Sequence, residues 1–184
     1  MIVGWAARAI LAATVLAAAA PARAAGAQAD APDGAFWSRV TLEVPVLTRH
    51  IPNRADLDNG DWGALVDVAV TRHWSIVGGD FINSFHRNTV FAAVSYTPVR
   101  FDLGKLRIAP GAMVGLDLNG GYRGFSQVDP LLAAVQIKLG AADLASPKYA
   151  FLERLGLAFT FIPPSMQRGG AMPVNLAVTY RLGS

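Results

Sequence analysis

The three histidines are the side chains that could bind a metal or transfer a proton. They stand at positions 50, 73 and 86, without the i, i+4 helical spacing of a zinc site, and the chain has no cysteine to supply a thiolate ligand. We therefore expect no metal and no cofactor. A neutral imidazole can instead take a proton from a hydroxyl while that hydroxyl attacks an ester. His86 lies two residues after Ser84 and is a weaker candidate for this role than His50, because a loop histidine is most often only solvated.

His50 ends the run EVPVLTRH, which alternates like a strand but carries Pro45 in its middle. Proline cannot donate to a ladder, and in sheets it is largely confined to edges, strand starts and bulges. The role of Pro45 in this strand depends on the strands that lie beside it.

Eight segments with a period of two follow the N-terminal region, and each has apolar side chains on one face and small or polar ones on the other. An even number of such strands in an exported chain predicts an all-β fold, an eight-stranded antiparallel up-and-down transmembrane β-barrel over residues 37–184. The expected strands cover 40–46, 62–71, 73–82, 89–97, 106–118, 131–139, 155–162 and 174–182.

The N-terminus has the pattern of a secretory signal. Arg8 precedes an apolar run at 9–20, and Ala22-Arg23-Ala24 is an A-x-A cleavage site. The run is shorter than the ~20 residues of a membrane anchor. We expect a signal peptide over 1–24 and a flexible leader over 25–36. Removal of the signal would leave the charge near neutral, so the high isoelectric point does not indicate nucleic-acid binding.

A soluble sandwich or lipocalin-like barrel would show the same alternation with its apolar face inside. Two observations favour the membrane alternative: the non-apolar face is rich in glycine and alanine, which suits a narrow lumen, and aromatic residues fall near strand ends as in an interfacial girdle. These aromatic residues are Trp37, Trp62, Trp74, Tyr96 and Tyr180. We expect a monomer in the cell outer membrane, with membrane lipids as partners.

Alternating connections determine which loops share a rim. With both termini in the periplasm, the links at 49–61, 83–88, 119–130 and 163–172 face outward. This places His50, Asn83 and Ser84 at one rim, and His73 at the other.

Several short motifs then resemble one family. Pro45-Val-Leu-Thr48-Arg-His50 resembles the first strand of PagP, the outer-membrane lipid A palmitoyltransferase family, which has proline, threonine and histidine at that spacing. Asn83-Ser84-Phe85 is similar to the family's Asp-Ser-Trp, and Phe159-Thr-Phe-Ile-Pro163 to its Thr-Tyr-Ile-Pro. The order and spacing of these motifs, over roughly 40–165, carry the resemblance.

The resemblance implies that prolines interrupt the ladder and open lateral gates for lipids, here at Pro45 and Pro163. Each proline leaves a neighbouring carbonyl unpaired, which in hydrocarbon costs several kcal/mol unless it is shielded or wet. For Pro163, which precedes Pro164, a simple strand end is the alternative.

The resemblance also implies site residues. His50 and Ser84 would be catalytic, with Asn83 at the family's aspartate position, where it can hydrogen-bond but cannot stabilise an imidazolium by charge. Asp56, Asp58, Asp61 or Asp80 could compensate. Ser95 falls at the floor of the acyl pocket, which implies a chain shorter than palmitate, and Arg123 could pair with a lipid A phosphate.

We therefore expect an outer-membrane acyltransferase that moves a fatty acyl chain from a phospholipid to lipid A or a similar acceptor. Two alternatives remain. One is a small structural or binding barrel without catalysis, and the other is a lipid esterase or deacylase on the same scaffold.

Overall fold

The computed structural model describes residues 35–52, 57, 59–60, 62–124, 126–142, 149–167 and 170–183. The expected signal peptide and the leader up to residue 34 lie outside this part of the chain. Phe36, placed in the leader from sequence, begins a short 3-10 helix. In the described part, no helix has the length and apolar character needed to cross a bilayer.

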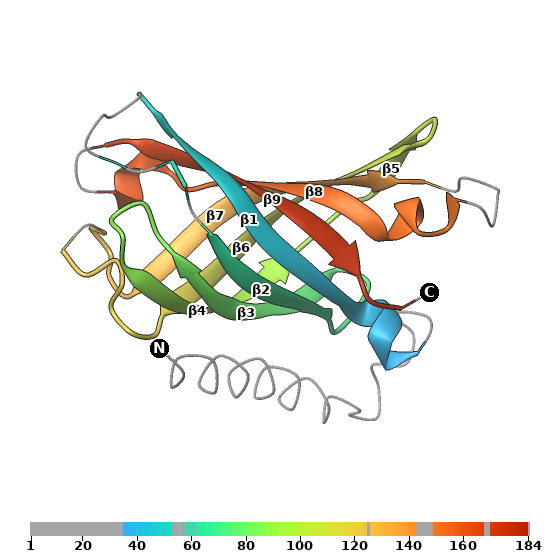
Figure 1. The fold of residues 1–184 in the computed structure, drawn as a ribbon, viewed down its shortest axis with the longest axis horizontal. Coiled ribbons are helices and arrows are strands. Elements are labelled where there is room, and N and C mark those ends of the chain that lie inside the picture. Colours follow the sequence, from blue (N-terminus) through green and yellow to red (C-terminus); the bar gives the residue numbers. More distant parts are fainter. Residues whose placement is uncertain are drawn as a thin grey trace.

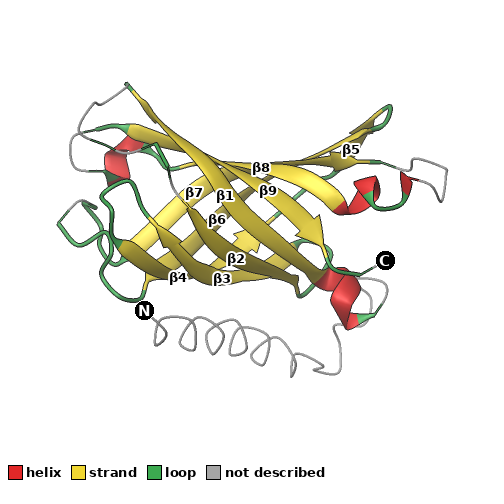
Figure 2. Cartoon of the chain, in the orientation of Figure 1, coloured by secondary structure: helices red, strands yellow, loops and turns green. Residues whose placement is uncertain are grey.

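The described residues form one antiparallel sheet of nine strands, and eight of them close into a barrel (Figures 1 and 2). The order runs β4-β3-β2-β1-β9-β8-β7-β6, and pairing of β4 with β6 completes the circle. The strands are β1 (Val40–Ile51), β2 (Trp62–Ala69), β3 (Trp74–Ile82), β4 (Asn88–Tyr96), β5 (Phe101–Leu103), β6 (Leu106–Asp117), β7 (Leu131–Ala141), β8 (Leu155–Phe161) and β9 (Met172–Arg181).

The eight predicted strands are confirmed, each at its expected place in the chain. The ninth, β5, pairs only with the start of β6 and stays outside the barrel circle. Three residues are too few to show a period of two, so this strand could not be predicted from sequence. Three 3-10 helices complete the described part: η2 (Phe36–Arg39), η4 (Leu152–Arg154) and η5 (Pro164–Met166).

The outer wall of the barrel is apolar and the lumen contains the polar side chains. Val94, Val114 and Val135 face outward and each keeps about half of its surface exposed. Inward positions hold buried Glu43, Asp67, Thr48, Gln136 and Thr179. A soluble barrel has the reverse arrangement, so the fold is that of a closed transmembrane β-barrel.

Exposed aromatic residues mark both ends of the apolar wall. Trp74 and Tyr96 stack side by side with their ring centroids 4.5 Å apart, near the end where β1 begins. Trp62 starts β2 at the opposite end and is 66% exposed. Such girdles are typical of barrels at membrane interfaces.

Three charged side chains meet across the middle of the lumen. Lys138 of β7 forms ion pairs with Asp67 of β2 and Glu43 of β1, the latter with its ammonium nitrogen 3.2 Å from Glu43 Oε1. We call these three residues the ion triad. Both carboxylates are buried, so removal of the lysine would leave two uncompensated charges in the interior.

Candidate lipid site

A largely apolar cavity of about 870 Å³ occupies the lumen on one side of the ion triad. Glu43 lies at its border, and the cavity extends from there to the end of the barrel at which β3 meets β4. The predicted residues His50, Ser84 and Pro45 all line this cavity. The apolar lining includes Leu65, Phe81, Phe91, Met113, Leu132 and Ile162.

A β-bulge in β1 turns His50 into the lumen. The pairing of β1 with β9 shifts between Pro45 and Leu47, so Val46 is an extra residue in the ladder. Pro45 is buried, Val46 and Leu47 both face outward, and the inward alternation resumes at Thr48. His50, two residues further on, is consequently inward and only 3% exposed.

Ser84 reaches the same cavity from the turn between β3 and β4. It is 6% exposed, and it sits more than thirty residues from His50 in sequence. Beside His50, the Asn175 side-chain amide on β9 donates to Thr48 Oγ1 at 2.9 Å. A strand and a turn therefore bring a hydroxyl and an imidazole to one apolar space, with further polar side chains at its wall.

Every hydrogen-bonding position of the Asn83 side chain has a partner, in the β3–β4 turn, in β4 or in the 119–130 loop. Its Nδ2 donates to Thr89 Oγ1 and to the Gly121 carbonyl, both at 3.0 Å. Its Oδ1 accepts from the backbone N–H groups of Phe85 at 3.0 Å and Arg87 at 3.1 Å. Asn83 thereby fixes the turn that carries Ser84, and it does not line the cavity.

We expect Asn83→Asp, which installs the residue type of the PagP motif, to destabilise the barrel by about 2 kcal/mol at neutral pH. The new carboxylate oxygen would face the Gly121 carbonyl, whereas a protonated carboxyl could donate to it. Burial of this oxygen against another acceptor would raise the carboxyl pKa above its unfolded value of about 3.9.

The destabilisation by Asn83→Asp should accordingly be smallest at pH below about 4 and grow as pH rises through the folded-state pKa. Denaturant unfolding of the protein in vesicles, compared at low and neutral pH, measures this. Asn88→Asp, which changes an exposed asparagine at the first position of β4, is the matched control. A variant as stable as wild type at both pH values would contradict the assignment of Asn83 to loop bracing.

Backbone pairing stops early between β1 and β2. The register joins only Val40 through Glu43 of β1 to Val68 through Leu65 of β2. Beyond that point, Pro45 has no N–H, and the Thr48 N–H donates to the Asn59 carbonyl outside β2. The wall beside Pro45 therefore lacks a strand ladder at the depth of the cavity.

A second interruption lies between β7 and β8. Their pairing ends at Val135 and Phe161, although β7 continues to Leu131 on the side of the cavity. Pro163 follows two residues after β8 and leads into η5. Both predicted gate prolines thus stand where a strand ladder ends, and Pro163 also fits the simple alternative of a strand end.

The remaining predicted residues lie at or away from the cavity as follows. Ser95 is buried in the lumen but is not in the cavity lining, whereas Met113, its partner across β4 and β6, is. Arg123 is exposed in the 119–130 loop, on the same rim of the barrel as His50 and Ser84.

The other two histidines lie away from the cavity. His86 is exposed in the β3–β4 turn, and His73 lies at the opposite end of the barrel, as expected. Asp80 lies opposite Ala64 of β2 and Val90 of β4, on the outer face of the barrel and not in the lumen. Asp56, Asp58 and Asp61 lie outside the described residues.

No role at the cavity is predicted from sequence for Tyr122 or Phe85. Their rings pack edge to face at 6.3 Å over the mouth of the cavity, and Asp117 Oδ2 accepts from the Tyr122 N–H at 2.7 Å. Two aromatic residues in polar outward loops are the signal that could have indicated them. Among the described residues there is no group of three or more acidic or histidine side chains that could hold a metal ion.

Comparison with known proteins does not assign the chain to a family. No protein-family model matches the chain, and no curated protein matches it significantly. The chain is similar to a solved structure described as "De novo design of transmembrane beta-barrels", at 14% identity over 78% of this chain and 94% of that one, with a TM-score of 0.42. We draw no conclusion about function from a likeness this distant.

Proposed function

We propose that the protein is an outer-membrane acyltransferase of PagP type, which moves a fatty acyl chain from a phospholipid to a hydroxyl of lipid A or a similar acceptor. One observation carries this proposal: His50 and Ser84 line a single apolar cavity whose wall lacks a strand ladder beside Pro45 and near Pro163. Apolar lining suits an acyl chain, and an interrupted wall gives lipids a lateral entry.

The cavity supplies the groups that an acyl transfer needs. The His50 imidazole takes a proton from the attacking hydroxyl as its oxygen bonds to the ester carbonyl carbon. The ester C–O bond then breaks, and the imidazolium returns the proton to the departing glycerol oxygen. If Ser84 provides the attacking oxygen, an acyl-enzyme forms and the acceptor hydroxyl later takes the acyl group by the same proton path. If the acceptor attacks directly, Ser84→Ala keeps activity.

Glu43 is the acid among the described residues of the cavity lining, and its carboxylate forms an ion pair with Lys138.

Mass spectrometry of lipid A from outer membranes with and without the protein tests the proposal. Gain of one acyl mass is the expected result. Loss of an acyl mass would instead establish a deacylase, with water as the acceptor. Unchanged lipid A together with unchanged phospholipids would favour the non-catalytic barrel.

We expect a disulfide across the β1–β2 interruption to block transfer. Val44 and Ala64 are the next positions in register after the last pair, Glu43 with Leu65, and both face outward. Oxidation of a Val44→Cys/Ala64→Cys variant would close the wall, and reduction would reopen it. Because the chain has no cysteine, only the new pair responds to redox conditions.

The matched control is Val94→Cys/Val114→Cys, an outward pair where β4 and β6 already form a ladder. Its activity should be the same oxidised and reduced. Transfer assays on both variants, before and after reduction, measure the effect. Equal activity of the oxidised Val44→Cys/Ala64→Cys protein and its reduced form would contradict entry at this seam.

A further inference from the structure

A second cavity, of about 1150 Å³, lies on the other side of the ion triad, toward the end where β1 begins. Its lining is polar and strongly cationic, and Asp67 is the acid among the described residues that line it. We call this cavity the basic chamber. Its cations come from separate elements: Arg39, Arg72, Arg100, Arg107, Lys138 and Arg181.

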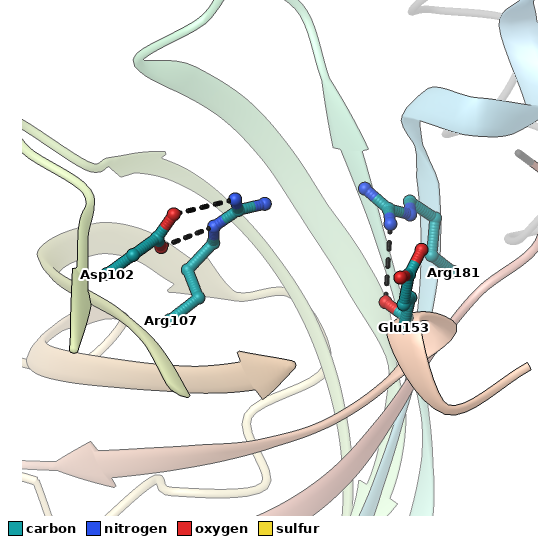
Figure 3. A network of polar contacts seen from close by, with 4 residues as sticks. All are labelled: Asp102, Arg107, Glu153 and Arg181. Atoms are coloured by element: carbon teal, nitrogen blue, oxygen red, sulfur yellow. Dashed lines mark hydrogen bonds and ion pairs between the residues drawn. The ribbon is translucent and has the colours of Figure 1, made fainter. Parts of the chain in front are cut away.

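Among the residues that the structure describes, carboxylates partner two of these cations. Lys138 belongs to the ion triad. Arg107 is held by Asp102 through two parallel hydrogen bonds, Nε to Oδ1 at 2.9 Å and Nη2 to Oδ2 at 3.1 Å (Figure 3). The chamber therefore carries more positive charge than its own acids neutralise.

The other guanidinium groups make different contacts. Arg181 donates to the backbone carbonyl of Glu153 at 3.3 Å (Figure 3). Within the described ranges, no ion pair joins Arg39, Arg72, Arg100 or Arg181 to a carboxylate. Arg39 Nε is buried without a hydrogen-bond acceptor. Donors are thus available in the chamber for a ligand.

The arginines are close enough to act on one another. Burial lowers the pKa of the Arg100 guanidinium, and repulsion from Arg107, and to a smaller extent from Arg72 and Arg181, lowers it further, while attraction to Asp67 opposes part of that shift. A concave surface that gathers charges of one sign raises the local concentration of counter-ions. An anion placed among these groups would relieve the repulsion.

We propose that the basic chamber binds a phosphate-bearing anion, which enters from the end of the barrel where β1 begins. Guanidinium forks match the oxygens of a phosphate in pairs, and several forks from different elements suit a group with three or more oxygens better than a single carboxylate. The hydroxyls of Thr41, Thr71 and Ser75 line the same space. This site is distinct from the acyl cavity and does not depend on the proposed transfer reaction.

Calorimetric titration of the refolded protein in non-ionic micelles with inorganic pyrophosphate tests the proposal. We expect saturable binding that weakens as salt is added, since screening reduces charge attraction. In an Arg72→Gln/Arg100→Gln variant, affinity should fall by about tenfold or more, because each substitution removes a charge-assisted contact. Both residues lie in links outside the barrel strands, so the wall should still form.

Arg49→Gln/Lys105→Gln is the matched control. It removes the same charge, but Arg49 is exposed on the outer face of β1 and Lys105 lies in the β5–β6 turn, outside the chamber lining. Unchanged pyrophosphate affinity in this control supports the site. Absence of binding to the wild type, or an equal loss in both double variants, would overturn it.

Competition with short-chain phosphatidate in the same micelles identifies the source of the phosphate. Displacement of pyrophosphate at lower concentration than free phosphate requires would assign a lipid head group. A lipid that does not displace it would assign a soluble phosphate. Both results require that pyrophosphate binds in the chamber. The competition measured on the wild-type protein should therefore be lost in Arg72→Gln/Arg100→Gln.

Discussion

Substituting His50 with alanine should reduce acyl transfer by about a hundredfold to ten-thousandfold, the usual contribution of a general base. His50 is the histidine in the cavity lining, and it is almost fully buried next to the apolar space. Without an imidazole, the attacking hydroxyl keeps its proton as the ester carbonyl is approached. Transfer of a radiolabelled acyl chain from phospholipid to lipid A by the refolded protein measures the loss.

His73→Ala is the matched control for His50→Ala. His73 is exposed at the opposite end of the barrel, where its Nδ1 lies 3.0 Å from the Thr97 carbonyl oxygen. Activity of the control should remain within about twofold of wild type, since surface substitutions away from a site have small effects. Full activity in His50→Ala would contradict the mechanism and leave the fold assignment untouched.

Lys138→Met should have the largest effect on stability. It removes the one cation of the ion triad and leaves Glu43 and Asp67 buried together in the lumen. Breaking a buried ion pair in this way costs about 3–5 kcal/mol. Guanidinium unfolding of the protein in vesicles measures the free energy of unfolding.

Two further variants identify the cause of that destabilisation. Lys105→Met removes a lysine from an exposed turn and should change the free energy of unfolding by less than about 0.5 kcal/mol. Glu43→Gln/Asp67→Asn/Lys138→Met removes the stranded charges and should recover most of the lost stability. If the triple variant is no more stable than Lys138→Met, lost packing rather than unpaired charge explains the effect.

The barrel could be predicted from sequence because its alternation is local and repeated. Each strand exposes one face to an apolar surrounding and the other to a narrow lumen, so a period of two survives in segments such as 174–182. The triad residues Glu43, Asp67 and Lys138 also appear on the polar face of that pattern. Their meeting across three strands could not be read, because it depends on register and shear of the closed sheet.

The orientation of His50 shows most clearly what the sequence alone does not determine. Strict alternation from Glu43 and Pro45 would place every even-numbered position, His50 included, on the outer face. The extra residue Val46 reverses the alternation, so Thr48 and His50 turn inward. Likewise, the early end of the β1–β2 and β7–β8 ladders and the bracing role of Asn83 depend on contacts between distant segments.

The ion triad stands between two compartments of the lumen. Glu43 borders the apolar cavity, while Asp67 and Lys138 border the basic chamber. Because these paired side chains reach across the lumen between the two spaces, we expect planar bilayers that contain the protein to conduct small ions no better than protein-free bilayers.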